Sequence, residues 1–400
     1  MLTKHMSRYE HSQPRGGLRV DKKATRTDSK NQNRRFVLQC VYGRQSTSRA
    51  DISRTTGLTR ATVSDIVSDL LDEGLVLEMG TAPSGGGKPP TLLAIAEDSH
   101  HLITVRLGAS HWTGSLLTLR RRIIRSTTVN SAGRRGAPAI DALREFVSEL
   151  IESTPEHILG IGIATPGTVT PDGMVREATM IDWHSAEVGE LLTEHFSIPT
   201  HVTNDANAVA LAEHSLGDHH ANDLLAIKIG TGVGSGIIVN GRPFSGESFA
   251  AGEIGHISVL ASPFDEAEHG TLEDVTSAVA FARRLDIGHP DFVDSQSVFR
   301  EAARRLTTGD PATVEMVDKG AKGLGTVLAM ATGILDVKTV VVCGPVTQLG
   351  DTFLDLTRRE MVRRAGPAHD PQTQVVYGTV DRAEEHGAAM LVLSRELGIL

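Results

Sequence analysis

Hydrophobic residues begin to recur at helical spacing near residue 31 of this chain. The spacing predicts one helix over residues 35–42, a second over 49–56 and a third over 60–73. A small polar residue stands directly before each of the last two, so we expect Ser48 and Thr59 to be their N-caps. The N-terminal part of the chain is therefore predicted to be a three-helix unit.

A short strand, a glycine-rich loop and a returning strand are predicted after the third helix. The strands cover residues 75–79 and 91–95, and the loop over 81–90 reads TAPSGGGKPP. A helix–turn–helix followed by such a hairpin is typical of a winged DNA-binding domain. In such a domain the second helix of the helix–turn–helix enters the major groove of DNA. A helical bundle used for protein contacts is the alternative, and the hairpin makes it the weaker interpretation.

We expect DNA contacts at the start of the third helix and at the tip of the wing. Hydroxyl and basic side chains there can donate hydrogen bonds to phosphates and base edges. The predicted DNA-binding residues are Arg49, Thr59, Arg60, Thr62, Ser64 and Lys88.

Strands and helices alternate over the rest of the chain. A meander of three strands is predicted near residues 102–128, and further buried strands cover 160–164 and 339–344. This alternation predicts an α/β body of two lobes with a cleft between them. Helices are predicted over residues 140–153, 188–195, 206–214, 275–285, 298–306, 311–335 and 351–365.

Carboxylates, glycines and a histidine gather between residues 203 and 256. Asp205 follows an extended run and opens an alanine-rich helical pattern, which puts its carboxylate near the positive end of a helix. A strand then turns through four glycines between Gly230 and Gly236, so that backbone N–H groups can approach a phosphate or hydroxyl. Glu253 and His256 are three residues apart and can share one face of a turn.

These groups predict a site for a polyhydroxylated ligand, because carboxylates and an imidazole satisfy the donors and acceptors of a sugar. Each residue also has a plainer interpretation. A carboxylate at a helix N-terminus is often only a cap, and a glutamate near a glycine turn is often solvated. The ligand interpretation depends on the residues converging in the fold.

Charge is distributed unevenly along the 400 residues, a length that suits two or three domains. Residues 1–90 contain 15 Lys and Arg against 9 Asp and Glu, a balance of +6; since the net charge is −9, residues 91–400 carry −15. A basic front on an acidic body indicates a polyanionic partner at one end. The unpatterned residues 1–30 are predicted to form a disordered basic tail, either only solvated or holding DNA non-specifically.

The predicted compartment is the cytoplasm, without a membrane partner. No run approaches the ~20 apolar residues that a membrane span needs. The first residues lack the apolar core of a secretory signal. The two cysteines, Cys40 and Cys343, lie among apolar residues and are expected to be reduced core thiols.

Several motifs occur here in the order typical of the ROK family (repressors, open reading frames and kinases): SGGGKP, IGIATPGTV, TNDANAVALAE, IGTGVGSGIIVNG and GEIGH. Over about residues 31–400 the chain resembles the branch with an N-terminal winged helix–turn–helix. The resemblance implies a two-lobed, actin-like, ribonuclease-H-like sugar kinase fold for the body. The expected domains are a disordered tail over 1–30, a winged helix–turn–helix DNA-binding domain over 31–97 and a ROK sugar-binding domain over 98–400.

The resemblance also implies site residues. Asp205 matches the position of the family's catalytic base for a sugar hydroxyl. The positions that match the family's sugar-binding residues are Asn204, Asp205, Glu253, His256 and Glu273.

The stretch that should handle Mg²⁺ and nucleotide departs from the kinase pattern. Family kinases begin the body with a strand ending in Asp-Gly-Gly-Thr, whereas residues 105–110 here read VRLGAS. Arg106 stands at the position of the metal-associated carboxylate and Ala109 at that of a glycine, and Pro345 replaces one of a glycine pair on the adenosine side. A cation repels Mg²⁺, on which phosphoryl transfer depends. We therefore expect no catalysis, with Asp205 a vestigial base.

The family's zinc site also lacks its ligands. A histidine of the GEIGH motif joins three cysteines in the family, and the matching positions here are Phe264, Glu266 and Thr271. None of these is a thiolate, so we expect no zinc and no other cofactor, which leaves His256 free to bind sugar. A weak oxygen and nitrogen site is the alternative, formed by Asp265, Glu266, Glu268 and His269.

Together these observations predict a sugar-responsive transcriptional regulator, a repressor of carbohydrate metabolism or transport genes. Its expected partners are double-stranded operator DNA, a sugar or sugar-phosphate effector bound without catalysis, and further copies of itself in a homodimer or tetramer. One alternative is an ATP-dependent, glucokinase-like sugar kinase with an appended DNA-binding domain. Another is a ligand-independent regulator whose body serves only for oligomerisation.

Overall fold

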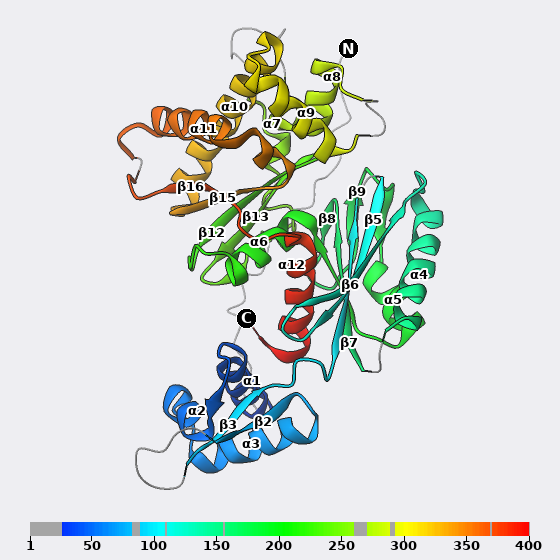
Figure 1. Ribbon diagram of the computed structural model, residues 1–400, viewed down its shortest axis with the longest axis vertical. Coiled ribbons are helices and arrows are strands. Elements are labelled where there is room, and N and C mark those ends of the chain that lie inside the picture. The colour runs from blue at the N-terminus through cyan, green and yellow to red at the C-terminus, as the bar shows by residue number, and fades with distance from the viewer. Residues whose placement is uncertain are drawn as a thin grey trace, which may run out of the picture.

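The computed structural model describes residues 26–81, 89–108, 110–154, 157–259, 270–288, 293–368 and 370–399. Over these residues the chain forms an N-terminal domain and a body of two lobes, with the N-terminal domain at one end of the long axis (Figure 1). Within the described part of the chain, no helix is both long enough and apolar enough to cross a membrane.

The N-terminal domain has the predicted winged helix–turn–helix elements. Ser48 caps α2 by accepting a hydrogen bond from the Asp51 backbone N–H, and Thr59 caps α3 in the same way from Thr62, so both predicted N-caps are confirmed. The sheet has the order β1-β3-β2. Its elements are α1 (Arg26–Tyr42), β1 (Thr47–Ser48), α2 (Arg49–Thr56), α3 (Arg60–Asp72), β2 (Val76–Thr81) and β3 (Thr91–Ile95).

Helix α1 begins earlier than expected. Residues 26–30 belong to it, so the predicted disorder of residues 1–30 is wrong for these five; residues 1–25 lie outside the described part. Two ion pairs join the extended helix to α3 and its C-cap: Lys30 lies 3.4 Å from Asp69, and Arg34 lies 2.5 Å from Glu73. Both pairs are partly or largely exposed, so each contributes little stability.

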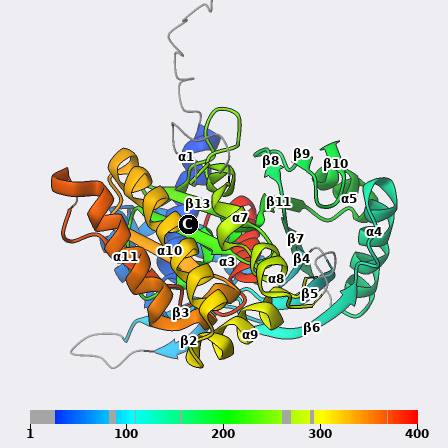
Figure 2. The same cartoon turned by 90° about the horizontal axis from the view of Figure 1, so that it is seen from above.

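Lobe 1 is a five-stranded sheet of order β11-β7-β4-β5-β6. The antiparallel meander predicted from the sequence forms β4, β5 and β6, and β7 and β11 then add in parallel. Helices α4 and α5 flank this lobe on its outer side (Figure 2). The bounds are β4 (His101–Leu107), β5 (His111–Thr118), β6 (Ile123–Asn130), α4 (Gly136–Glu152), β7 (Ile158–Thr165), α5 (Val188–Phe196) and β11 (Thr200–Asn204); a small sheet contains β8 (Thr168–Val169), β9 (Val175–Ala178) and β10 (Trp183–Ala186).

Lobe 2 repeats the same plan. Its order is β14-β13-β12-β15-β16, again three antiparallel strands followed by two parallel ones. Helices α10 and α11 lie on the side opposite to α4 and α5 (Figure 2). The bounds are β12 (Leu224–Ile229), β13 (Val233–Val239), β14 (Arg242–Pro243), α7 (Leu272–Thr276), α8 (Ala278–Leu285), α9 (Ser295–Thr307), α10 (Pro311–Leu335), β15 (Thr339–Cys343), α11 (Gly350–Ala365) and β16 (Gln374–Tyr377).

The predicted fold class is therefore confirmed, with local differences. The single helix expected over residues 275–285 is broken into α7 and α8 at Ser277, whose side chain accepts from the Ala280 N–H and starts a new helix. The sheet β8–β9–β10, strand β16 and the last helix, α12 (Ala383–Val392), were not expected from the sequence.

Two helices cross between the lobes, α6 (Asp205–Leu216) and α12 (Figure 1). They pack closely because Gly387 of α12 has no side chain: a Cβ there would lie 1.8 Å from the carbonyl oxygen of Ala208 in α6. Residue 162 of β7 is also a glycine, and a Cβ there would lie 2.4 Å from the Ala388 carbonyl oxygen. The small residues thus allow α12 to lie directly on both α6 and lobe 1.

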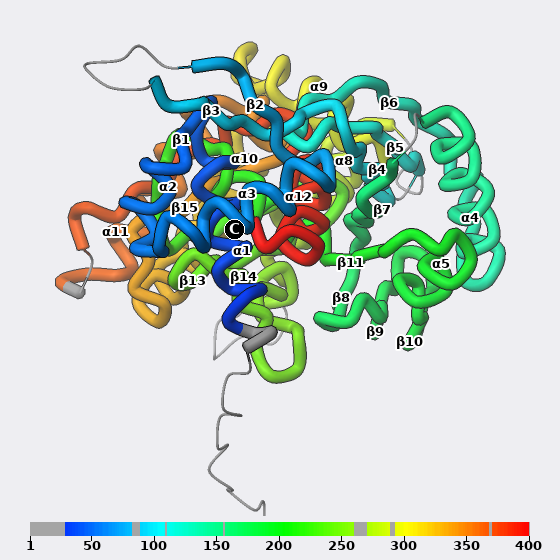
Figure 3. The backbone as a smooth tube through the Cα atoms, turned by 90° about the horizontal axis from the view of Figure 1, so that it is seen from below, coloured from blue at the N-terminus to red at the C-terminus, as the bar shows by residue number. Residues whose placement is uncertain are grey.

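The N-terminal domain is docked onto the body. Leu38 of α1 belongs to the same buried cluster as Leu397 near the C-terminus, and Figures 1 and 3 both show α1 next to the C-terminal end of the chain. The Tyr42 hydroxyl donates to the Leu119 carbonyl oxygen at 3.0 Å, and Arg120 donates to the Tyr42 carbonyl oxygen at 2.7 Å. These contacts join the two parts through packed side chains.

Candidate functional site

A cleft of about 660 Å³ lies between the two lobes. It brings together all of the residues predicted to bind sugar, although they come from β11, α6, α7 and the segment before α7. Their convergence was the condition on which the ligand interpretation depended, and their role in binding stays a prediction. These lining residues are Asn204, Asp205, Glu253, His256 and Glu273.

Asn204 and Asp205 lie where β11 passes into α6. The Asn204 side-chain oxygen accepts from the backbone N–H groups of Ala206 and Asn207 at 2.9 and 3.1 Å, so Asn204 is the N-cap. Its amide also donates to the Gly167 carbonyl oxygen at 2.8 Å. This capping fixes the next residue, so the Asp205 carboxylate is held in the first turn of α6, at the positive end of the helix dipole.

Glu273 is fixed by the turn between β12 and β13. Its Oε2 accepts a hydrogen bond from the backbone N–H of Val233 at 2.8 Å. A Cβ at residue 232 would lie 2.8 Å from that oxygen, so Gly232 allows the carboxylate to approach the backbone. The glycine turn predicted from the sequence therefore holds a carboxylate of the cleft in place.

Glu253 and His256 form the exposed rim of the cleft. Glu253 Oε2 lies 3.8 Å from His256 Nε2, and the side chains are 41% and 75% exposed. Partial burial raises the pKa of Glu253; His256 opposes this rise, and Asp205 and Glu273 add to it. The rim thus contains a carboxyl and an imidazole that can rearrange around a ligand.

Sequence reasoning missed Lys228, the penultimate residue of β12. Its Nζ lies 2.6 Å from Asp205 Oδ2 and 3.6 Å from Glu384 Oε1 at the start of α12. Burial opposes its charge, but the carboxylates of Asp205 and Glu384 outweigh burial and raise the pKa of Lys228. The signal was visible as one lysine in the otherwise apolar strand LLAIKI.

Arg106 occupies the equivalent position in lobe 1, as the penultimate residue of β4, and it also lines the cleft. Its guanidinium donates to the Thr113 hydroxyl at 3.4 Å. The neighbouring Ala109, predicted to replace a glycine, lies outside the described residues. A positive side chain thus stands at this point of each lobe.

Only part of the segment that matches the family's zinc ligands is described. Most of the segment matching the family's cysteines, 260–269, lies outside the described residues, including Phe264, Glu266 and the alternative ligands Asp265, Glu268 and His269. Thr271 is described, and its hydroxyl caps α7 by accepting from the Asp274 N–H. Among described residues no group of three His, Cys, Asp or Glu side chains is arranged to hold a metal.

The predicted DNA contacts lie at the start of α3, on the N-terminal domain. Arg60 is exposed, whereas Thr62 and Ser64 are half-buried. The Thr59 and Thr62 hydroxyls lie 2.9 Å apart in a hydrogen bond, so the cap also orders the second threonine.

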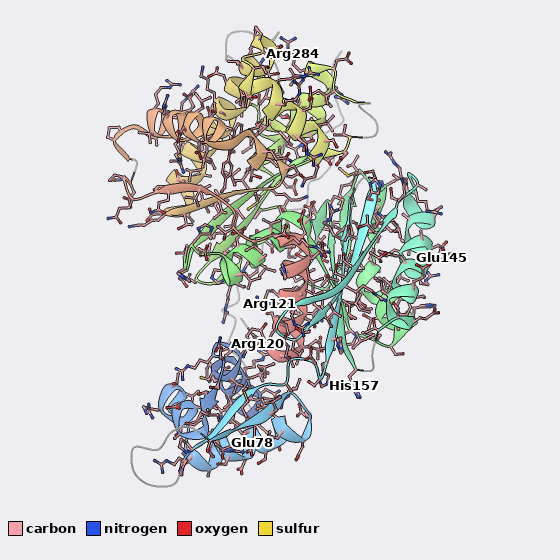
Figure 4. All side chains as sticks on the ribbon, viewed as in Figure 1. Glu78, Arg120, Arg121, Glu145, His157 and Arg284 are labelled. Atoms are coloured by element: carbon pink, nitrogen blue, oxygen red, sulfur yellow. The ribbon has the colours of Figure 1, made fainter. Side chains whose placement is uncertain are left out.

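Arg49 and Lys88 differ from this group. Both terminal nitrogens of Arg49 donate to Glu78 Oε1 at 3.1 Å, so part of its charge is neutralised within the domain (Glu78 is labelled in Figure 4). Lys88, at the predicted tip of the wing, lies outside the described residues. The DNA role of all six residues stays a prediction.

A winged helix–turn–helix docked on a two-lobed body with a polar cleft defines a DNA-binding regulator with a small-molecule site. A family model described as the ROK family matches residues 102–395. The chain belongs to the ROK family.

Two relatives that match most of the chain are transcriptional regulators by name. A putative xylose repressor from Caldicellulosiruptor sp. (strain Rt8B.4) is 26% identical over 90% of this chain and 95% of its own length. The DNA-binding transcriptional dual regulator NagC of Escherichia coli (strain K12) is 27% identical over 86% of this chain and 88% of its own. The chain is therefore assigned to the transcriptional regulators of the family.

Solved structures agree on the fold. A ROK family transcriptional regulator described as a homolog of the E. coli MLC protein covers 93% of this chain and 98% of its own, with a TM-score of 0.79 and 22% identity. A ROK family glucokinase from Streptomyces griseus, in complex with glucose and AMPPNP, covers 73% of this chain and 98% of its own, with a TM-score of 0.62 and 26% identity. The kinase thus matches less of the chain than the regulator does.

Proposed function

We propose that this ROK protein is a cytoplasmic repressor whose cleft binds a sugar or sugar phosphate without phosphorylating it, and that binding changes its affinity for operator DNA. The observation that carries the proposal is the ion pair of Asp205 with Lys228, at 2.6 Å, inside a cleft that still contains the other polar sugar-site residues. The carboxylates that can accept hydrogen bonds from a ligand remain in the cleft. Phosphoryl transfer needs a free base and Mg²⁺. Here Lys228 pairs with Asp205 at the position of the base, and Arg106 stands at the position associated with the metal.

The cleft suits a polyhydroxylated ligand. Asp205, Glu253 and Glu273 present carboxylate oxygens that accept from hydroxyl groups, and His256 can donate or accept. Sugars offer both kinds of group around one ring. The names of the relatives supply candidate effectors: xylose, N-acetylglucosamine and glucose.

The DNA side follows from α3 and the wing. As proposed, Arg60, Thr62 and Ser64 at the start of α3 enter the major groove, and Arg49, Thr59 and Lys88 add contacts around them. Two copies would bind half-sites about 34 Å apart, one helical turn of DNA, so we propose a homodimer or a tetramer. The exposed apolar residues Met330 and Ile334 of α10, 52% and 81% exposed, support self-association.

The test is a binding titration with DNA from upstream of the chain's own gene and of neighbouring transport genes. Fluorescence anisotropy would measure the operator affinity with and without D-xylose, D-glucose, N-acetyl-D-glucosamine and their phosphate esters. We expect specific binding that one of these compounds weakens by about 5- to 150-fold, the usual range of allosteric coupling. Specific binding that no compound changes would contradict the proposal and favour a ligand-independent regulator.

A sugar kinase with an appended DNA-binding domain is the second candidate. It is favoured by the retained glycine turn between Gly230 and Gly236 and by the likeness to the glucokinase. Incubation with ATP, Mg²⁺ and the same sugars separates the two. We expect no sugar phosphate, and turnover by purified protein would establish the kinase instead.

A further inference from the structure

We propose that Lys228 and Glu384 couple the effector to the DNA-binding domain: Lys228 joins Asp205, which contacts the effector, to helix α12, which reaches α1. Both are positioning residues, because neither has to touch the sugar. The inference rests on the proposed function, since it takes Asp205 to be a sugar contact.

The three groups form a partly buried ion cluster. Lys228 Nζ lies 2.6 Å from Asp205 and 3.6 Å from Glu384, and the three side chains are 18–21% exposed. In such surroundings charges act on one another more strongly than at the surface. One ammonium is thus shared unequally between two carboxylates.

The cluster joins three separate elements. Lys228 lies on β12 of lobe 2, whereas Asp205 and Glu384 lie in the first turns of α6 and α12, the two helices between the lobes. Among the described residues only Oδ2 of Asp205 is ion-paired, so Oδ1 is left to accept from a ligand hydroxyl. A hydroxyl bound there weakens the hold of Asp205 on the ammonium, because the carboxylate charge is then shared.

Once a ligand hydroxyl has weakened the pair with Asp205, Glu384 becomes the stronger partner of Lys228. The Lys228–Glu384 contact shortens, and the first turn of α12 is drawn toward β12. The effector can shift the equilibrium only by its differential interaction with the two arrangements. In the proposal this difference lies at Asp205, which accepts a ligand hydroxyl more strongly once the ammonium, 2.6 Å away without ligand, has moved toward Glu384.

Helix α12 leads from this cluster to the DNA-binding domain (Figure 1). After Val392 it continues through a π-helical turn, Leu393–Leu397, and the next carbonyl oxygen, of Gly398, accepts from Gln39 Nε2 of α1 at 2.8 Å. Leu397 shares the buried cluster of Leu38 in α1. A movement of α12 is therefore passed on through residues 393–398 to the first helix of the N-terminal domain.

Arg121 makes a second link between the same two helices (labelled in Figure 4). Its guanidinium lies 2.7 Å from the Met390 sulfur of α12 and 5.6 Å from the centre of the Tyr42 ring in α1.

The plainer alternative is that Lys228 only stabilises the fold. The coupling role and the purely stabilising role differ in one measurable quantity, the factor by which the effector changes operator affinity.

The experiment measures this coupling factor in the full-length protein. Operator affinity is determined by anisotropy and sugar affinity by calorimetry, with D-xylose, D-glucose, N-acetyl-D-glucosamine and their phosphate esters as probes. The test variant Glu384→Gln keeps the 2.6 Å pair and removes only the link to α12. The control Asp318→Asn removes an exposed ion pair with Lys322, 2.7 Å long, on the outer helix α10.

We expect Glu384→Gln to keep sugar affinity within about 3-fold of wild type, while its coupling factor falls from about 5–150 to near 1. Asp318→Asn should behave as wild type. Lys228→Met tests the same link from its other end and should also uncouple the sites. Thermal midpoints check that each variant is folded. If Glu384→Gln fails to fold, the coupling factor of Lys228→Met tests the inference in its place.

Full coupling in folded Glu384→Gln would overturn the inference and leave the proposed function standing. Loss of sugar binding in that variant would make Glu384 a ligand contact and also overturn its positioning role. If wild type itself responds to none of the probes, the proposed function fails and this inference fails with it.

Discussion

The two lobes have the same strand order, and each places a cation at the penultimate residue of its first strand. Their surroundings differ. Lys228 of lobe 2 lies 2.6 Å from the Asp205 carboxylate, whereas Arg106 of lobe 1 has, among the described residues, only the Thr113 hydroxyl at 3.4 Å. Equivalent positions in a repeated fold thus have different chemistry, because their roles depend on the partners supplied by the helices between the lobes.

This difference assigns separate tasks to the two cations. The charge of Lys228 is used within the protein, in a cluster that connects the cleft with α12. Arg106 lines the cleft without a carboxylate partner among the described residues, and we propose that its charge disfavours Mg²⁺ there. The comparison predicts large effects where the lobes are joined and small ones at Arg106.

The strongest disruption is expected at the crossing of α6 and α12. Gly387→Ala would place a Cβ 1.8 Å from the Ala208 carbonyl oxygen, so we expect the free energy of unfolding to fall by about 3 kcal/mol or more. Gly333→Ala in α10 is the matched control, because its Cβ would meet nothing within 4 Å. It should stabilise the protein by about 0.5–1 kcal/mol. Urea denaturation measures both, and equal effects would contradict the close crossing.

Asp205→Ala should have the next largest effect, this time on the effector. It removes a ligand acceptor and leaves Lys228 paired only with Glu384, 3.6 Å away. We expect sugar affinity to fall by about 100-fold, as for the loss of a charge-assisted hydrogen bond of about 3 kcal/mol. Operator affinity without sugar should shift toward that of sugar-bound wild type, because Lys228 is left to Glu384 as in the proposed effector-bound arrangement. Calorimetry measures the sugar affinity and anisotropy the operator affinity, and an unchanged sugar affinity would count against Asp205 as a ligand contact.

The exposed rim of lobe 2 should respond to pH. The raised pKa of Glu253 means that this carboxyl takes up a proton above the ordinary glutamate range. Sugar affinity should therefore fall on acidification, as the ionised acceptor is lost. Glu253→Gln should have weaker affinity at neutral pH but a flatter pH profile.

The same shift fixes the sign for stability. The fold favours the protonated carboxyl, so the stability that Glu253 contributes is present below its ordinary pKa and is lost as pH rises through the raised value. The thermal midpoint of Glu253→Gln at neutral pH should therefore not lie below that of wild type. If the sugar affinity of Glu253→Gln still falls on acidification as in wild type, Glu253 is not the group that makes sugar affinity depend on pH.

Arg106→Gln should have the smallest effect. The guanidinium is only half-buried and has a single long hydrogen bond, so stability should stay within about 0.5 kcal/mol of wild type. The coupling between sugar and operator should also be retained. A loss of coupling as large as that expected for Lys228→Met would show that the two cations are equivalent after all.

Features with a local cause could be predicted from the sequence. The caps Ser48 and Thr59 follow from side chains within three residues of the groups they satisfy. Helix α10 has the predicted bounds, 311–335, because Asp310 caps it and Pro311 occupies its first turn. The break at Ser277 is also local, but its cap competes with a continuous helical pattern over residues 275–285, and that pattern predicts a single helix.

Features that depend on the tertiary fold could not be predicted from the sequence. The five sugar-site residues were found by resemblance, and their meeting in one cleft became visible only in the structure. Lys228 was missed although it is a lysine in an apolar strand, and its partner Glu384 lies on a helix that was not predicted. Nothing in the sequence indicates that these two side chains meet, because the contact depends on how α12 crosses between the lobes.

Reciprocal linkage tests most directly whether the cleft and the DNA-binding domain form one coupled system. Calorimetry would measure the affinity of wild type for the sugar that shifts operator binding, first alone and then with saturating operator DNA. The operator must change sugar affinity by the same factor, about 5–150, as the sugar changes operator affinity. A sugar affinity that is identical with and without bound operator would contradict the account.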